Sequence, residues 1–100
     1  MKVKIPKQFE LAGQTIKTKV ADNIDTDGAV GLSKFHQNEI RVRRVVEGEP
    51  VSHDVQLQTF FHELAHFMLY VMNEHELNSN EKFVDNLGQF LYQFEKSRKF

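Results

Sequence analysis

Two histidines and a glutamate interrupt the most apolar stretch of the chain. The stretch is FFHELAHFM, and its titratable members are His62, Glu63 and His66. On a helix, His62 and His66 project from one face, one turn apart, so that both imidazoles can bind one cation. Glu63 lies about 100° further around the helix, near enough to contact a water at that cation. Because a buried and unpaired His or Glu costs several kcal/mol, this HExxH pattern predicts a metal site.

A catalytic zinc site needs a third protein ligand and keeps one position for water, whose pKa the metal lowers to about 7. Since the chain has no Cys, that ligand must be a His, Asp or Glu of another element. The segment NEKFVDNLG, residues 80–88, supplies a candidate, because Glu81, Asp85 and Gly88 share one stripe of a helix. Gly within a helix costs about 1 kcal/mol relative to Ala, which indicates close approach of two helices at Gly88. From this stripe, Asp85 can accept a hydrogen bond from a ligand histidine and fix its tautomer.

Both carboxylates also have a simpler interpretation. Glu81 would be a solvated residue in the first turn of its helix, where a negative charge interacts favourably with the helix dipole. Asp85 would be one of the exposed carboxylates that are common on helix surfaces.

The two segments together resemble the gluzincin metallopeptidases, whose pattern is HExxH followed by NExxxD on a glutamate helix. Here HExxH begins at His62 and NExxxD begins at Asn80. The short chain is similar to the smallest members, the minigluzincins. The resemblance implies these roles: zinc ligands at His62, His66 and Glu81, a general base at Glu63, and a partner of a ligand histidine at Asp85.

The implied activity is zinc-dependent hydrolysis of peptide bonds in a peptide or protein substrate. Larger gluzincins place a His or Tyr of a downstream domain over the scissile carbonyl. The substitutes available in this chain are His36, His53, His75, Tyr70 and Tyr92. Two other functions stay open: a zinc-holding binding or regulatory module with little or no turnover, and an ImmA-like metallopeptidase acting on one regulatory protein. The ImmA-like pattern around the third ligand fits NEKFVDNLG less well.

The elements that position these residues follow from periodicity and turn signals. The first half predicts three or four short strands at 9–11, 15–21, 29–35 and 39–46, with turns at 12–14 and 36–38 and a loop at 22–28. Turns this short predict antiparallel pairing. In the last strand, Ile40 and Val42 alternate with charged residues, so one face of the sheet should be solvated. If the strand at 29–34 is an exposed edge above the active-site helix, an extended peptide can add to it.

The second half predicts two helices, over about 53–73 and 79–97, separated by a loop at 74–78. Ser52 or Asp54 can cap the first helix, and its nearly continuous apolar surface predicts burial. We expect the second helix to pack against the first through an apolar face formed by Phe83, Val84, Leu87, Phe90, Leu91 and Phe94. The fold class is therefore α+β, a small antiparallel sheet followed by an active-site helix and a glutamate helix. This order agrees with a zincin-like fold.

Composition limits the remaining possibilities. One hundred residues with 40% hydrophobic side chains suit one globular domain, residues 1–100. The 13 basic and 14 acidic residues nearly cancel, so no strong field attracts nucleic acid or an anionic membrane. The longest apolar run, Phe67 to Met72, is far shorter than the roughly 20 residues that cross a bilayer. Without Cys or a secretion signal, we expect a soluble, cytoplasmic protein.

Overall fold

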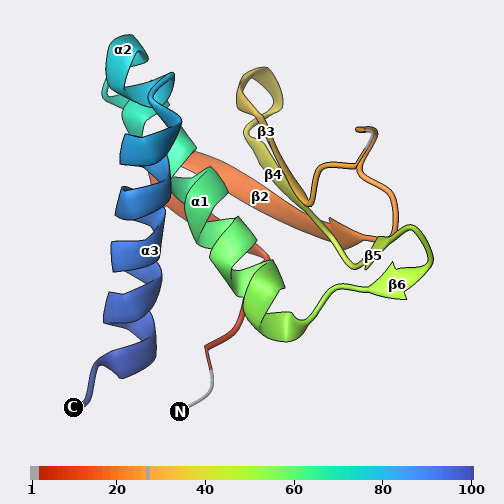
Figure 1. Ribbon diagram of the computed structural model, residues 1–100. Helices are drawn as coiled ribbons and strands as arrows, with labels where there is room; N and C mark the ends of the chain where they lie inside the picture. Colours follow the sequence, from red (N-terminus) through yellow and green to blue (C-terminus); the bar gives the residue numbers. More distant parts are fainter. Residues whose placement is uncertain (1–2, 27) are drawn as a thin grey trace.

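The strands precede the three α-helices along the chain (Figure 1). The structure is a computed structural model and describes residues 3–26 and 28–100. Its elements are β1 (Gln8–Leu11), β2 (Gln14–Ala21), β3 (Gly31–Lys34), the 3-10 helix η1 (Phe35–Gln37), β4 (Glu39–Arg43), β5 (Val45–Val46), β6 (Glu49–Pro50), α1 (His53–Val71), α2 (His75–Asn78) and α3 (Glu81–Ser97). The α+β class is confirmed, and the residues expected as a loop at 74–78 mostly form the short helix α2.

The four-stranded sheet is mixed, so the prediction of a purely antiparallel sheet was wrong. Its strand order is β1-β2-β4-β3. Strand β1 pairs antiparallel with β2, and β3 with β4, whereas β2 and β4 are parallel. Short turns predict the pairing of sequential strands only. The chain from β2 to β4 spans residues 22–38, of which residue 27 lies outside the described part, and it is long enough for a parallel crossover. This connection contains β3 and leaves it at the edge of the sheet.

The charged face of the sheet is more closely paired than a solvated face would be. Ile40 and Val42 are fully buried on the opposite face, as expected. Glu39 is only 7% exposed, with Arg41 Nε at 2.5 Å and Lys19 Nζ at 3.1 Å from its carboxylate oxygens. Burial raises the pKa of Glu39, but the hydrogen bonds from Arg41 and Lys19 outweigh this effect and lower the pKa below its usual value. The charges on this face therefore form a network.

Helix α1 lies between the sheet and α3 and contacts both (Figure 1). It begins after Ser52, whose hydroxyl accepts a hydrogen bond from the Val55 amide at 3.2 Å. Residues on several sides of α1 are buried: Leu57, Phe60, Phe61, Ala65, Phe67 and Leu69. The predicted burial of this helix is confirmed. No helix in the described ranges is both long enough and apolar enough to cross a membrane.

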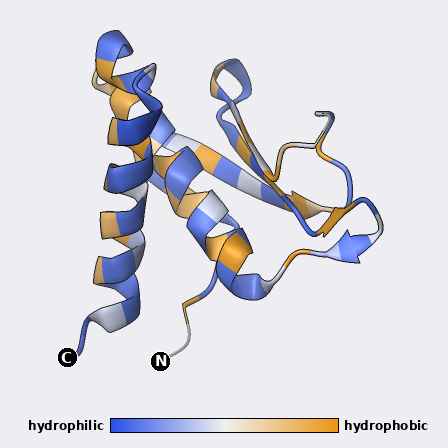
Figure 2. Ribbon diagram, in the orientation of Figure 1, coloured by the Kyte–Doolittle hydropathy of each residue, from blue (hydrophilic) through white to orange (hydrophobic). Residues whose placement is uncertain are grey.

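Helix α3 buries a different face from the one that its apolar pattern predicts. Apolar and polar bands alternate along it in Figure 2, and its buried residues are Val84, Gly88 and Tyr92. Three phenylalanines of the expected core face are exposed: Phe83 by 39%, Phe90 by 71% and Phe94 by 64%. The prediction was therefore wrong for these phenylalanines, whereas Val84 of the same predicted face is fully buried, as expected. Only the side of α3 that carries Gly88 can approach the α1 backbone closely, and this contact determines how α3 is turned.

Tyr92 ties α3 to the start of α1. Its hydroxyl donates a short hydrogen bond to the Asp54 carboxylate, and its ring stacks on Phe61 with centroids 5.5 Å apart. The hydrogen bond to Asp54, together with burial, raises the pKa of Tyr92 to about 12. The same hydrogen bond, with one from Gln58, lowers the pKa of Asp54. This contact fixes one end of the helix pair, and the predicted metal ligands lie toward the other end.

Candidate metal centre

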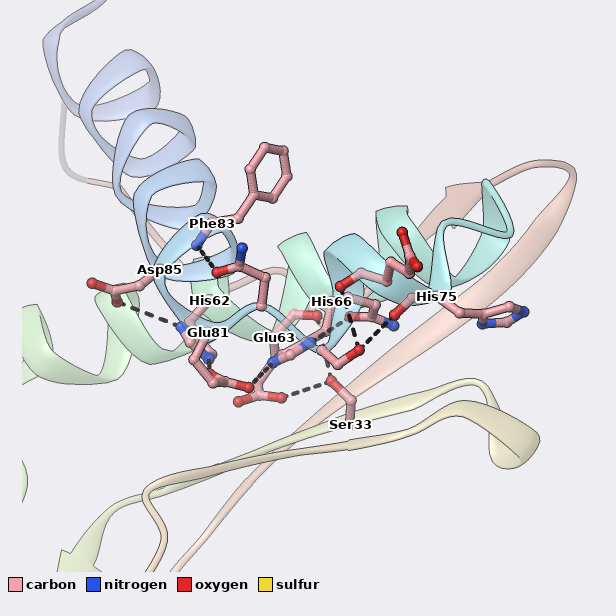
Figure 3. A network of polar contacts seen from close by, with 12 residues as sticks. Ser33, His62, Glu63, His66, His75, Glu81, Phe83 and Asp85 are labelled. Atoms are coloured by element: carbon pink, nitrogen blue, oxygen red, sulfur yellow. Dashed lines mark hydrogen bonds and ion pairs between the residues drawn. The ribbon is translucent and has the colours of Figure 1, made fainter.

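The three predicted ligands meet between α1 and α3 (Figure 3). His62, His66 and Glu81 each offer one ligand atom, and these atoms lie within 4.8 Å of one another. Nε2 of His62 is 3.4 Å from Oε2 of Glu81, and Nε2 of His66 is 3.5 Å from Oε1 of the same carboxylate. The tertiary structure thus brings together residues from two helices that the sequence separates by a turn and the helix α2.

The spacing of these atoms fits a small tetrahedral cation. Bonds from zinc to histidine nitrogen and carboxylate oxygen are about 2.0–2.2 Å long, so two ligand atoms of a tetrahedral site lie about 3.4 Å apart. The two distances of 3.4 and 3.5 Å, each from one imidazole to a different oxygen of the Glu81 carboxylate, are close to this value. Imidazole and carboxylate also form the donor set that zinc and other first-row divalent ions accept. The residues present therefore fit a divalent transition metal such as zinc.

Two local features place Glu81 opposite the histidines. Asn80 caps α3, because its side-chain oxygen accepts a hydrogen bond from the Phe83 amide at 3.1 Å, so Glu81 is the first residue of the helix. About two turns further on, a Cβ at Gly88 would lie 2.9 Å from Cα and 3.0 Å from N of His62. Only glycine leaves room for this approach of α3 to the backbone of α1.

Each ligand histidine has an oxygen acceptor near its second ring nitrogen. Oδ1 of Asp85 lies 3.6 Å from Nδ1 of His62, somewhat longer than a hydrogen bond. Oδ1 of Asn78 lies 2.5 Å from Nδ1 of His66. A proton on Nδ1 leaves the Nε2 lone pair free to bind a metal. Asp85 is thus near the position expected of it. Asn78 was not predicted from the sequence, because no local pattern distinguishes it from its polar neighbours until the position of α2 is known.

Glu63 lies beside the three ligands and takes no part in their cluster. Its side chain is 8% exposed and accepts a hydrogen bond from Ser33 Oγ to Oε1 at 2.7 Å. Figure 3 shows Ser33 reaching toward it from the strand below. Ser33 also escaped sequence reasoning, because it is 30 residues from Glu63 in the chain.

A pocket of about 260 Å³ opens beside Glu63. It is bounded by the edge of the sheet, α1 and α3, and is lined by Val30, Gly31, Val55, Gln58, Thr59, His62, Glu63 and Asp85. The pocket therefore brings an edge strand, the candidate base and one candidate ligand to one open surface.

The residues considered as substitutes over a substrate carbonyl lie elsewhere. These were His36, His53, His75, Tyr70 and Tyr92, and none of them lines the pocket in the described part of the chain. Tyr92 is hydrogen-bonded to Asp54, and Nε2 of His53 is 3.2 Å from the Val3 carbonyl. His75 points away from the candidate ligands in Figure 3. Among the described pocket residues, His62 is the one imidazole.

Comparison with protein-family models, curated proteins and solved structures found no match. The function must therefore be argued from the geometry of these side chains.

Proposed function

We propose that this chain is a small zinc-dependent peptidase of the gluzincin type. The observation that carries the proposal is the division of roles at the site. Nε2 atoms of His62 and His66 both face the Glu81 carboxylate at 3.4–3.5 Å, while Glu63 stays outside this group and adjoins the pocket. Metal-assisted hydrolysis of a peptide bond uses three protein ligands for the metal and a separate carboxylate as the base.

The chain's own residues would divide the work as follows. His62, His66 and Glu81 would hold the ion. Zinc bound there supplies a Lewis acid that polarises the scissile carbonyl and lowers the pKa of a water to about 7. Glu63 would accept a proton from the attacking water and return it to the leaving nitrogen. Its low exposure and its hydrogen bond to Ser33 hold the carboxylate in one place for this transfer.

Strand β3 supports a peptide as the substrate. It is the outer strand of the sheet and contacts α1, as expected of an edge strand beside this helix. Val30 and Gly31, at the start of this edge, line the pocket next to Glu63. An extended peptide that adds to β3 through main-chain hydrogen bonds would place one of its bonds beside the candidate base.

A second candidate function is a metal-holding binding or regulatory module with little turnover. It is favoured by one observation: within the described residues, the pocket holds no Tyr, and His62 is its one His. A developing oxyanion would lack a side-chain donor of the kind that larger gluzincins use. Loss of one such donor lowers the rate roughly 10²–10³-fold. Both candidate functions therefore include a bound metal, and they differ in how fast a peptide is hydrolysed.

Metal analysis and peptide cleavage, measured on four proteins, test the proposal. Wild type and Glu63→Gln should each bind one equivalent of zinc, whereas Glu81→Ala should bind it more weakly. Wild type should cleave members of a panel of unstructured peptides, and Glu63→Gln should be slower by about 10² to 10⁴, the usual contribution of a general base. Glu49→Ala, which removes an exposed carboxylate on β6, is the control and should match wild type in both measurements.

Three results decide between the candidates. One equivalent of zinc with no cleavage of any peptide selects the binding module. Full cleavage by Glu63→Gln rules out the assigned base. Unchanged zinc affinity in Glu81→Ala contradicts both candidates, since both need the third ligand.

A further inference from the structure

Strand β3 contacts the Glu63 side chain at two inward-facing positions, Gly31 and Ser33. Ser33 Oγ donates to Oε1 of Glu63 at 2.7 Å (Figure 3). Gly31 has no side chain, and this leaves room for the Glu63 carboxylate. A Cβ at position 31 would lie 3.0 Å from Oε2 and 3.1 Å from Cγ of Glu63. The two carboxylate oxygens are therefore held against β3 at two residues of the same face.

The two oxygens of Glu63 have different surroundings. Ser33 has one hydroxyl proton, and Oε1 at 2.7 Å is much closer to its oxygen than the Glu63 carbonyl at 3.4 Å. A hydrogen bond from a hydroxyl to a carboxylate is charge-assisted and about twice as strong as a neutral one. Oε1 is thus engaged by Ser33, and Oε2 is the oxygen left for proton transfer at the pocket.

The main chain at the same two residues faces the free edge of the sheet. Arg43 N donates to the Val30 carbonyl at 2.8 Å, so these residues form a hydrogen-bonded pair of the antiparallel ladder between β3 and β4. Hydrogen-bonded pairs alternate along such a ladder, and the next one on β3 is Leu32. The main-chain groups of Gly31 and Ser33 therefore point away from β4, toward the side where no strand of the described residues follows in the sheet.

We propose that Ser33 is a positioning residue for Glu63, and that Gly31 provides the space in which the carboxylate is held. This inference rests on the proposed peptidase function and adds a link between substrate binding and the orientation of the general base. The residues that would hydrogen-bond the backbone of an added peptide are the same residues that orient the general base. Substrate and base are thus aligned by one short segment of β3.

Substitutions at Ser33 test the hydrogen bond. Ser33→Ala removes the donor, so Glu63 gains rotational freedom, and kcat should fall about tenfold, less than the roughly 10²-fold cost of a group displaced by about 1 Å. KM and zinc content should stay at the wild-type values. Ser33→Thr keeps the hydroxyl and should restore kcat to within about twofold of wild type. Ser97→Ala removes a hydroxyl at the end of α3 and should leave kcat unchanged.

A substitution at Gly31 tests the space independently. A Cβ at this position would also collide with Cγ2 of Thr59, so Gly31→Ala is best made in a Thr59→Ser background, which removes that methyl group. The next nearest atoms to this Cβ are Oε2 and Cγ of Glu63. The double variant should have a kcat about tenfold below Thr59→Ser alone, with the same zinc content.

Crystal structures of the metal-free proteins give a readout that needs no activity. In wild type, Glu63 should occupy one position bonded to Ser33, and in Ser33→Ala it should occupy more than one rotamer. A wild-type protein that cleaves no peptide would defeat the proposed function, and the crystal structures would still decide the role of Ser33. The inference is overturned if Glu63 keeps its single position in Ser33→Ala, or if an active wild type and Ser33→Ala share the same kcat.

Discussion

At the scale of single residues, each candidate ligand histidine has different partners at its two ring nitrogens. Nε2 faces the Glu81 carboxylate, and Nδ1 faces a second oxygen, from Asn78 at 2.5 Å for His66 and from Asp85 at 3.6 Å for His62. Because the acceptor at Nδ1 fixes the tautomer and the ring orientation, the closer contact should matter more. Asn78 is therefore expected to contribute more to metal binding than Asp85.

This expectation gives a prediction for Asn78→Ala. The variant should bind zinc about 10- to 100-fold more weakly than wild type, the usual cost of losing a hydrogen-bond partner of a ligand histidine. Asp85→Ala should lose less, because its contact is longer. Competition with a chromophoric chelator measures both affinities. Asn86→Ala, an exposed amide on α3, serves as the control, and an Asn78→Ala affinity equal to that of Asn86→Ala would contradict the assignment.

At the scale of elements, the site depends on how α3 lies against α1. Gly88 permits backbone contact near His62, and the hydrogen bond between Tyr92 and Asp54 holds the other end of the pair. Since the candidate ligands come from two helices, a small change in helix separation moves Glu81 relative to both histidines. Metal binding and helix packing should therefore respond together to substitution at the contact.

Gly88→Ala tests this link. Alanine raises helix propensity by about 1 kcal/mol, but the added Cβ would meet the His62 backbone at 2.9–3.0 Å, and backbone cannot move aside cheaply. Overpacking of this kind usually costs about 1–3 kcal/mol, so the free energy of unfolding in urea should fall and zinc affinity should fall with it. Gln89→Ala, the exposed neighbour, should change stability by no more than about 0.5 kcal/mol. A Gly88→Ala protein more stable than wild type would show that the helices do not touch there.

At the scale of the whole molecule, the hydrophobic core lies between the sheet and α1, and α3 covers the outer side of α1. Phe67 on α1 is fully buried, as are Ile16, Ile40 and Val42 of the sheet. Most of the phenylalanine surface of α3 faces outward instead, with Phe90 exposed by 71%. Two phenylalanines on neighbouring helices should thus differ strongly in their contribution to stability.

Comparison of Phe67→Ala with Phe90→Gln measures this difference. Emptying a core site costs about 3–5 kcal/mol, whereas an exposed substitution by a good helix former should change the free energy of unfolding by about 0.5 kcal/mol or less. Chemical denaturation of both variants provides the values. Equal losses would mean that the outer face of α3 is buried in the protein as it exists in solution.

Local pattern was sufficient to predict the four strands of the main sheet, the two long helices and the ligand candidates. Periodicity places α1 and α3 within two residues of the observed ends, and Ser52, one of the two expected caps of α1, accepts a hydrogen bond from an amide that a helix start leaves free. The spacing of His62 and His66 follows from helix geometry alone. The stripe that holds Glu81 and Gly88 turns toward α1 for the reason the sequence indicates, because glycine marks the close approach.

Tertiary structure alone decided the rest. Periodicity shows that α3 has an apolar side but cannot say which neighbour is near, and backbone contact at Gly88 left Phe83, Phe90 and Phe94 outside. The parallel pairing of β2 with β4 depends on where the chain places β3. The contacts of Ser33 with Glu63 and of Asn78 with His66 join residues 30 and 12 positions apart. Hydrogen bonds at such separations form only after sheet and helices have packed, so no local pattern encodes them.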